Sequence, residues 1–371
     1  MKLLTLLALL LAHAAEAQDT TVWTQFSVRV RGGDYRYGYK DAAGHLKIPA
    51  KFGLFTPAQK FRHIMAVSDG QSLRQYYLLK NGQPVGRDSV YMFDYQVDCE
   101  QEGFIRFKDR KKDRVGFLNA QGRVAIPAQY NMVSPFYNGL AVALSGARRT
   151  CWDRSTDTLH CEHLGWTGGH EVVINQRNEV VFDQLSLAKM GSSHLNFYSL
   201  QRNAPVVDTA TTVTLTAMNG DRYTFTDYDK EFNQWFFGQF VPAVRSGPAA
   251  VRPLCYAELA TAGQPFRGWQ HTEPGAFVQA HFPVLRAQLA DLRPNSKQVQ
   301  VGPDDLNTLT FNSPRFASFL TDCGEHFAKK YPVFSVILAI KATGGNSNIN
   351  HQWQYSFIRT AQGYRLYEAS F

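Results

Sequence analysis

The stretch VGFLNAQGRVAIPAQYNMVSPFYNGLAVA, residues 115 to 143, decides the fold of this chain. An apolar run opens it and leads into the tight turn Asn119-Ala120-Gln121-Gly122, where Gly122 can take a positive φ angle. Residues 123 to 126 then alternate between less apolar and more apolar side chains, which is the period of a half-buried strand. Pro127 ends this strand or places it at a sheet edge, because proline cannot donate a ladder hydrogen bond. The stretch therefore predicts short strands joined by tight turns.

The same pattern occurs elsewhere in the chain. Residues 37 to 52, YGYKDAAGHLKIPAKF, align without a gap onto residues 115 to 130, at an offset of 78 residues (116 − 38). Between these copies Gly82 marks another turn, 38 residues after the first turn glycine (82 − 44) and 40 before the third (122 − 82). Residues 172 to 182 form a degenerate fourth copy in which Asn178 replaces the glycine, since asparagine tolerates the left-handed region. A period near 39 predicts a mainly β domain of antiparallel hairpin repeats.

The pattern Gly-aromatic-x-[Asp/Asn]-x-x-Gly-x-x-x-Ile-Pro-x-x-[Phe/Tyr] resembles the WG repeat family over about residues 35 to 185. The residues that carry it are Gly38, Asp41, Gly44, Ile48, Pro49 and Phe52 in the first copy and Gly116, Asn119, Gly122, Ile126, Pro127 and Tyr130 in the third. Tyr37 and Val115 stand where that family has tryptophan. The resemblance implies a β-rich binding or structural scaffold, of a kind frequent in bacterial exported and surface proteins. It carries no catalytic residues.

The N-terminus reads as a secretory signal peptide, residues 1 to 17. Lys2 is its positive start, the run from Leu3 to Leu11 is its apolar core, and Ala15-Glu16-Ala17 is the cleavage site. No later stretch reaches 18 apolar residues, so we expect no transmembrane segment after cleavage. The sequence therefore predicts a protein that is periplasmic, attached to the cell surface or secreted, and the resemblance to the WG repeat family implies a bacterial one.

The formal net charge is +8, which suits acidic surface polymers or anionic headgroups as partners. The densest basic run is residues 108 to 114, between two expected strands. Its residues Arg110, Lys111 and Lys112 are candidate binding residues, although a solvated hairpin tip explains the run equally well. Nucleic acid is not expected as a partner of an exported protein.

Export permits disulfides, and the chain has five cysteines. Cys151 and Cys161 flank a polar excursion from the repeat spacing, so we expect a disulfide between them. Cys255 and Cys323 are the second candidate pair, which leaves Cys99 as a buried thiol.

A second domain is expected after the repeats. We divide the mature chain into a repeat domain (residues 18 to 200), a linker (201 to 212) and an α+β domain (213 to 371). The latter should open with a hairpin around Asn219-Gly220 and continue with helices over about 229 to 241, 272 to 292 and from Ser313 to before Pro332. Strands from Val333 onward complete an α+β pattern that is similar to NTF2-like domains.

Few residues point to chemistry. The chain has no phosphate loop, H-E-x-x-H, G-x-S-x-G or C-x-x-C motif. The cluster His160-Cys161-Glu162-His163 does not have the spacing of a common zinc motif, so no metal and no cofactor is expected. Asp322 and His326 are expected to contact each other on a helix surface. In the second domain, Trp235, Phe277, His281 and Trp353 either line a cavity or fill the core.

The sequence favours an exported, non-catalytic binding or scaffold protein that recognises a protein or a surface glycan through the repeat loops. The longest loops are residues 53 to 63, 132 to 139 and 145 to 169, so the recognition surface should lie there. Phe136 and Tyr137 are the candidate aromatic anchors, although both also suit a core. The alternative is an enzyme or a small-ligand binder that uses the cavity of the second domain. The sequence leaves open whether the repeats close into a propeller or form an open array.

Overall fold

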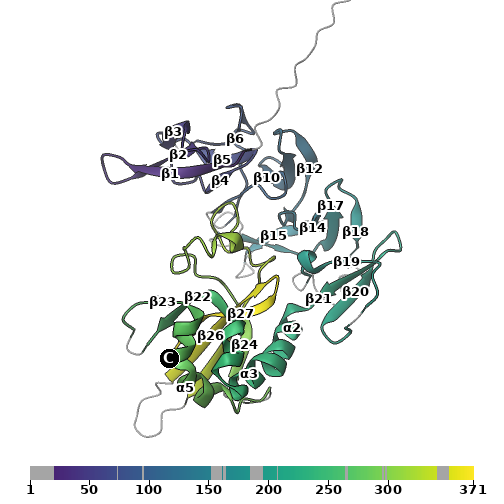
Figure 1. The fold of residues 1–371 in the computed structure, drawn as a ribbon. Coiled ribbons are helices and arrows are strands. Elements are labelled where there is room, and N and C mark those ends of the chain that lie inside the picture. Colours follow the sequence, from purple (N-terminus) through teal and green to yellow (C-terminus); the bar gives the residue numbers. More distant parts are fainter. Residues whose placement is uncertain are drawn as a thin grey trace, which may run out of the picture.

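The computed structural model describes residues 21–72, 74–93, 96–151, 161, 164–183, 195–206, 208–263, 266–294, 296, 299–340 and 351–371. The fold is rich in strands and has few helices. Most of the strands up to residue 226 form small antiparallel sheets that follow one another along the chain (Figure 1). The predicted signal peptide lies outside the described residues.

Five of these sheets have three or four strands. The first is β3(Leu46–Phe52)-β2(Tyr35–Lys40)-β1(Trp23–Arg29)-β4(Lys60–Phe61), and the second is β5(Ile64–Ser68)-β6(Gln75–Leu79)-β7(Pro84–Val85). The third is β10(Phe104–Asp109)-β11(Arg114–Asn119)-β12(Val124–Tyr130). The fourth is β13(Met132–Val133)-β14(Leu140–Ser145)-β17(His170–Asn175)-β18(Val180–Phe182), and the fifth is β19(Gln201–Arg202)-β21(Arg222–Thr226)-β20(Thr212–Thr216). Two shorter ladders are β8(Met92–Phe93)-β9(Gln96–Val97) and β15(Arg148–Cys151)-β16(Leu164–Thr167).

The five sheets stack face to face, because alternate residues of a strand point to opposite faces. In β5, Met65 and Val67 pack with the first sheet, whereas Ile64 and Ala66 pack with the third. The third and fourth sheets share the next apolar cluster, and the fourth and fifth share the one after it. Among the described residues, no buried cluster joins the first sheet to the fifth. The apolar clusters therefore join neighbours along the chain.

Two hairpins of the stack have the same pairing register. β2 and β3 pair Tyr37 with Phe52, and β11 and β12 pair Val115 with Tyr130, each residue being shifted by 78 (115 − 37 and 130 − 52). Both ladders have an irregularity at the glycine that follows. A methyl group on Gly38 would lie 2.6 Å from a backbone oxygen, and one on Gly116 would lie 2.4 Å from the equivalent oxygen. These positions need glycine because the partner strand passes too close for a side chain.

One turn recurs at seven places, beginning at residues 30, 41, 79, 119, 175, 217 and 321. Each time the first residue donates its N–H to the carbonyl four residues on and accepts a hydrogen bond from the N–H three residues on. At Asp41, Asn119 and Asn175 the side-chain oxygen also accepts from two backbone N–H groups of the turn, at 2.9–3.0 Å. Asn178 has a φ of 64° where Gly122 has 71°, as expected from the degenerate copy.

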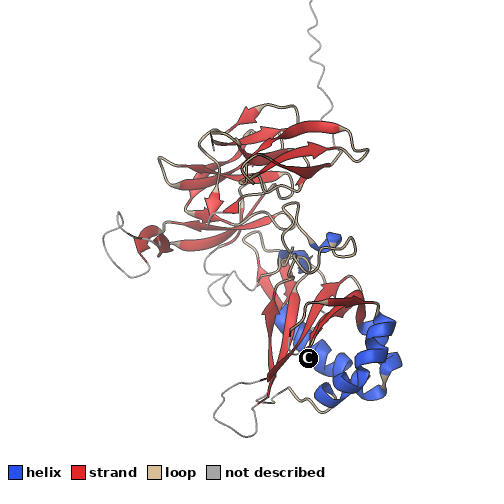
Figure 2. Ribbon diagram, turned by 90° about the vertical axis from the view of Figure 1, so that its left-hand side faces the viewer, coloured by secondary structure: helices blue, strands red, loops and turns tan. Residues whose placement is uncertain are grey.

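The C-terminal part contains a six-stranded sheet with helices on one face (Figure 2). Its order is β23(Gln270–Thr272)-β22(Cys255–Ala262)-β27(Gly363–Ser370)-β26(His351–Thr360)-β25(Val333–Ile340)-β24(Val299–Asp304), and only β22 and β27 are parallel neighbours within it. The helices are α2(Tyr228–Trp235), the π-helical η3(Phe236–Phe240), α3(Val241–Ser246), α4(Pro248–Val251), η4(Arg252–Leu254) and α5(Pro274–Leu289). Asp227 caps α2 by accepting from the N–H of Lys230. An apolar cluster that begins at Tyr228 fills the space between these helices and the sheet.

Residues 305 to 332, which we call the crossing segment, cover the other face of this sheet and reach back to the repeats. The prediction of a helix from Ser313 is wrong, since only the short 3₁₀ turn η5(Ala317–Phe319) forms there. The apolar side chains of this segment contact two different surfaces. Phe316 and Phe319 pack onto the sheet, whereas the ring of Phe327 lies 5.3 Å from that of Tyr198 in the repeat part. A single helix face cannot satisfy both partners.

Several contacts join the crossing segment to the repeats. Cys99 forms a disulfide with Cys323, so the expected pair of Cys255 with Cys323 is wrong and Cys99 is not a thiol. Cys255 is the free, buried cysteine. Cys151 pairs with Cys161, as predicted.

The expected contact between Asp322 and His326 is also wrong. Asp322 instead forms an ion pair with Arg62 at 2.5 Å, and its carbonyl accepts from Lys60. His326 pairs with Asp305 within the crossing segment itself. Without the helix, the two residues are no longer one turn apart.

Candidate functional site

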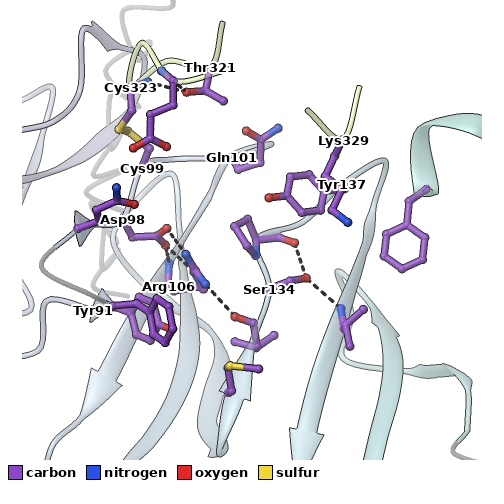
Figure 3. Close-up of a pocket in the computed structure, with 18 of the residues that line it drawn as sticks. Tyr91, Asp98, Cys99, Gln101, Arg106, Ser134, Tyr137, Thr321, Cys323 and Lys329 are labelled. Carbon is purple, nitrogen blue, oxygen red and sulfur yellow. Dashed lines mark hydrogen bonds and ion pairs between the residues drawn. A yellow bond between two sulfur atoms is a disulfide. The ribbon is translucent and has the colours of Figure 1, made fainter. Parts of the chain in front are cut away.

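A cavity of about 480 Å³ lies where the repeats meet the crossing segment (Figure 3). The loop before β10 contributes Asp98, Cys99 and Gln101, and the crossing segment contributes Thr321, Cys323 and Lys329. Residues from the chain between β12 and β14 complete the lining, among them Met132, Val133, Ser134, Pro135 and Tyr137. The Cys99–Cys323 disulfide therefore forms part of the wall.

A second hollow of about 740 Å³ continues from the first, and the two share Tyr91, Phe93, Met132 and Glu171 in their walls. Phe93 is 65% exposed, which is unusual for a large apolar side chain inside a concave surface. At the far end, the guanidinium of Arg149 lies 4.0 Å from the ring centre of Trp166. We call the two hollows together the central groove.

An ion pair forms the floor of the groove. Arg106 donates from Nη2 to Asp98 at 2.6 Å and from Nε at 3.0 Å, and its Nη1 donates to the carbonyl of Val133. Its guanidinium also lies 4.4 Å from the ring centre of Tyr91. Burial alone would lower the pKa of Arg106, but the charge of Asp98 and the hydrogen bonds to it raise that pKa above its ordinary value. Arg106 is therefore bonded to Asp98 and to the carbonyl of Val133, and through these contacts it holds the loop before β10 against β13.

Other polar groups in the groove are free to meet a ligand. Within the described part of the chain, no hydrogen bond or ion pair reaches the hydroxyl of Tyr137, the carboxyl group of Glu325 or the amino group of Lys329. Burial raises the pKa of Glu325, and the charges of Asp98 and Asp305 raise it further. Burial lowers the pKa of Lys329. The sequence pattern gave no signal for Glu325 or Lys329, which lie far along the chain from the repeat residues beside them, for example 188 positions between Tyr137 and Glu325 (325 − 137). It gave none for Arg106 either, because the partners of this side chain are set by the packing of Asp98 and Val133 against it.

The candidate binding residues of the repeats lie in different surroundings. Tyr137 lines the groove, but Phe136 is fully buried between the third and fourth sheets, so it is a core residue and cannot be an exposed anchor. Arg110, Lys111 and Lys112 are exposed at the tip of the β10–β11 hairpin. They do not line the groove. The loops 132 to 139 and 145 to 169, where we expected recognition, both contribute residues to it.

The space that was expected to form a cavity in the C-terminal part is filled by the side chains that were expected to line it. Phe277 is fully buried, and Trp235 and Trp353 pack against the same apolar cluster. The ring of His281 stacks on Phe371 with centres 4.9 Å apart, and partial burial lowers its pKa. These four residues therefore contribute to the core between the helices and the sheet.

Glu368 is a buried carboxyl group that the sequence analysis missed. It lies on β27 opposite Ser356 of β26, which in turn lies opposite Ser335 of β25. Ser335 and Ser356 are hydrogen-bonded at 3.0 Å, and Ser335 donates to Asp304. Burial, with a smaller contribution from the charge of Asp304, raises the pKa of Glu368 to about 7.

Three residues of the sequence cluster that was compared with zinc motifs lie outside the described residues, namely His160, Glu162 and His163. In the part that is described, no group of three or more His, Cys, Asp or Glu side chains is arranged to hold a metal ion. Among the same residues, no helix has both the length and the apolar composition needed to cross a bilayer.

A family model described as WG containing repeat matches residues 116–146, which include the third copy of the repeat pattern. The chain thus contains a WG repeat over this short segment. No curated protein matches the sequence.

Proposed function

We propose that this protein is an exported, non-catalytic binding protein of the cell envelope or exterior, and that the central groove binds its partner, a protein or a surface glycan. The observation that carries the proposal is the groove itself. It is concave, mostly apolar, lined by two of the three predicted recognition loops (132 to 139 and 145 to 169, but not 53 to 63) and closed by a disulfide. The signal-peptide pattern and the two disulfides support export.

We further propose that the five sheets are copies of one WG-type repeat with a period of about 39 residues. The shared register at an offset of 78 supports this, and so does the presence in each sheet of one turn at an equivalent place, beginning at residues 41, 79, 119, 175 and 217. The turn of the fifth sheet begins at residue 217, and Tyr223 and Phe225 pack with Phe182 of the fourth sheet. The α+β domain then begins near Asp227 instead of residue 213. Its similarity to NTF2-like domains stays a prediction.

Binding by the groove is tested with two matched variants. Phe93→Glu places a charge in the groove at an exposed position, and Leu309→Glu does so on the crossing segment at a side chain that is 87% exposed. Neither change should affect folding. We expect the oxidised wild-type chain and Leu309→Glu to retain the same partner from an envelope extract, and Phe93→Glu to lose it. Equal retention by all three proteins would exclude the groove as the binding site.

The basic hairpin tip is a separate prediction. If Arg110, Lys111 and Lys112 also touch the partner, reversing their charges should weaken binding without changing thermal stability, since all three side chains are exposed. Unchanged affinity of this triple variant in the same assay would leave the tip as a solvated turn. The alternative of an enzyme or small-ligand site among Trp235, Phe277, His281 and Trp353 gains no support from their packing.

A further inference from the structure

We propose that the first and second sheets form another binding surface, separate from the central groove, and that its ligand is a polysaccharide carrying carboxylate groups. The inference goes beyond the proposed function, because among the described residues this surface shares no lining residue with the groove. Two adjoining hollows of about 680 and 460 Å³ form the surface, and both are lined by Lys51, Asp69 and Tyr76. We call the two hollows together the basic trough.

Basic side chains outnumber acidic ones in the trough. Among the described residues that line it, the cations are Arg36, Lys51, Arg74 and Arg87, and the carboxylates are Asp69 and Asp88. Lys51, Arg74 and Arg87 are exposed, and within the described part of the chain their side chains make no hydrogen bond or ion pair. A concave surface lined mostly by one sign of charge concentrates its electric field and attracts ligands of the opposite sign.

Close packing around Gly70 fixes Arg36 at one end of the trough. A methyl group added to Gly70 would lie 2.5 Å from Nε of Arg36 and 2.5 Å from the carbonyl oxygen of Lys51. The Arg36 side chain therefore lies in the space that a side chain at position 70 would need. Its Nη1 also donates to the carbonyl of Tyr35 at 3.2 Å. These contacts place the guanidinium of Arg36 beside the backbone of Lys51.

The two carboxylates distinguish an acidic sugar from other anions. Hydrogen bonds from the N–H groups of Ser72 and Gln71 to Asp69 lower the pKa of Asp69, so its carboxyl group stays charged. The carboxyl group of Asp88 has no hydrogen bond or ion pair among the described residues. A phosphate polymer offers only acceptors to these carboxylates, whereas the hydroxyl groups of a sugar donate to them. The carboxylates of an acidic sugar in turn accept paired hydrogen bonds from arginine.

Tyr76 lies between the two hollows, because its side chain lines both. The ring is half-buried and packs against the apolar cluster of the first two sheets. A ring held in this way offers a flat, electron-rich face on which the C–H face of a sugar can stack. Burial raises the pKa of the Tyr76 hydroxyl, Asp69 raises it further and Arg87 lowers it, so both charges lie near the ring. The stacking face, the cations and the carboxylates therefore belong to one surface.

The trough leads to the basic hairpin tip. Arg110 donates from Nε to the carbonyl of Asp88 at 2.7 Å, so the tip begins beside a residue that lines the trough. A polysaccharide lying in the trough reaches Arg110 and continues toward Lys111 and Lys112. An extended polymer makes such contacts in succession, so they need not meet at one point.

The test measures binding of oligosaccharides to the oxidised full-length chain by titration calorimetry at neutral pH. The acidic probes are oligomers of galacturonate, of mannuronate and of hyaluronan, and each is compared with the same oligomer after its carboxyl groups have been reduced to alcohols. We expect at least one acidic oligomer to bind about tenfold more tightly than its reduced form, the value of one hydrogen bond to a charged group. Its affinity should fall as salt is added, because exposed charges are screened.

Polyphosphate, single-stranded DNA and vesicles containing phosphatidic acid represent the other polyanions. We expect each of them to bind more weakly than the acidic oligosaccharide, because their phosphates meet Asp69 and Asp88 without hydroxyl donors. Equal or tighter binding of any of the three overturns the proposal, and so does failure of all three acidic oligosaccharides to bind.

Variants test whether the trough is the site. Arg74→Gln with Arg87→Gln removes two exposed cations and should weaken binding of the acidic oligosaccharide by about tenfold or more without changing the melting temperature. Arg222→Gln with Arg293→Gln removes the same charge from exposed positions in the fifth sheet and after α5, and should leave the affinity unchanged. Tyr76→Leu should weaken binding several-fold and Tyr76→Phe should not, which separates stacking from loss of the hydroxyl.

Phe93→Glu separates the trough from the central groove. This variant should bind the acidic oligosaccharide as the wild-type chain does, whether or not it retains the partner of the groove. The proposal is overturned if Phe93→Glu loses the oligosaccharide, or if the double variant at Arg74 and Arg87 keeps wild-type affinity for it. If no oligosaccharide binds while Phe93→Glu loses its partner, the proposed function of the groove stands without the trough.

Discussion

At Gly116 a single added methyl group would lie 2.4 Å from the carbonyl oxygen of Ile126 and 2.7 Å from the backbone nitrogen of Ala128. Both contacts are to backbone, which cannot move without breaking the β11–β12 ladder. We expect Gly116→Ala to lower the free energy of unfolding by about 1–3 kcal/mol, the usual cost of overpacking a core. Urea unfolding followed by circular dichroism measures the change.

The matched control is Gly238→Ala. Gly238 lies in η3, where an added methyl group meets no atom within 4 Å. Because alanine favours helix, this variant should be neutral or slightly more stable. A loss of stability at Gly238 equal to that at Gly116 would mean that close strand approach is not the reason for glycine in the repeat.

Arg106 provides a second prediction at this scale. The side chain of its partner Asp98 is only 6% exposed, so removing the guanidinium leaves a carboxylate with little access to water. We expect Arg106→Leu to cost about 3–5 kcal/mol, as for other broken buried ion pairs. Arg177→Leu, which breaks an exposed pair with Glu179, should have little effect on thermal unfolding. Similar melting temperatures for both variants would contradict a structural role of the groove floor.

Local sequence predicted single residues well where only the backbone decides. The glycines of the tight turns and Asn178 as their left-handed substitute were expected, because a tight turn needs a positive φ angle at that position. Phe136 and Tyr137 show where prediction from local sequence fails. The two aromatic neighbours point to opposite surroundings, one in the core and one in the groove, and only the packing of two sheets separates them.

At the scale of elements, Asp304, Ser335, Ser356 and Glu368 form a row of polar residues across β24 to β27. We expect the titration of Glu368 in this row to make the free energy of unfolding depend on pH. Glu368 has a folded-state pKa of about 7 against an ordinary value of 4.5, so the folded state favours the protonated form. The free energy of unfolding should therefore fall as pH rises from about 4.5 to about 7 and then level off, by on the order of 3 kcal/mol. Denaturant unfolding at a series of pH values measures this.

Glu368→Gln removes the titrating group while keeping its shape. This variant should match the wild-type protein near pH 5 and be more stable than it above pH 7. Asp291→Asn serves as the control for loss of one negative charge at an exposed site. If Glu368→Gln shows the wild-type pH dependence between these limits, the burial of Glu368 is not its cause.

Elements stabilised by their own neighbours were the predictable ones. The hairpins were expected from period-two patterns and turn residues, and a helix that includes most of α2 was expected over about residues 229 to 241. The helix expected from Ser313 failed because its apolar spacing arises from two separate partners, the sheet and Tyr198. A periodicity argument assumes one buried face, and the crossing segment has two.

At the scale of the whole molecule, the Cys99–Cys323 disulfide holds the crossing segment on the repeats. The two cysteines are 224 residues apart, and removing a cross-link of that span costs about 5 kcal/mol in the loop-entropy description. We expect the double variant Cys99→Ser with Cys323→Ser to lower the melting temperature and to abolish binding in the groove.

Cys151→Ser with Cys161→Ser is the matched control, because it also removes one disulfide but closes a span of only 10 residues. Its loss should be smaller, and groove binding should persist. Full binding by the Cys99 and Cys323 double variant would show that the remaining contacts, such as Arg62 with Asp322, position the crossing segment without the disulfide.

The groove itself was beyond sequence reasoning. Its walls join Asp98 and Arg106 to Glu325 and Lys329, and nothing local requires these residues to meet. The loops 132 to 139 and 145 to 169 were expected to form the recognition surface because of their length. The crossing segment, which completes the groove with them, was instead predicted to be a helix of the C-terminal domain. The incorrect pairing of Cys255 with Cys323 has the same origin, since it assumed that the C-terminal part was closed upon itself.

The same disulfide fixes an order of events in the making of the protein. Cys151 and Cys161 can join as soon as their short loop has been synthesised, whereas Cys99 must remain reduced until almost the whole chain exists. During that interval Cys99 can form a wrong disulfide with Cys255, or with Cys151 or Cys161 before these two have joined. Such a disulfide can be corrected only by thiol exchange. The groove is therefore completed last. A molecule with a complete groove has therefore already joined the repeats to the crossing segment through the correct pair of cysteines.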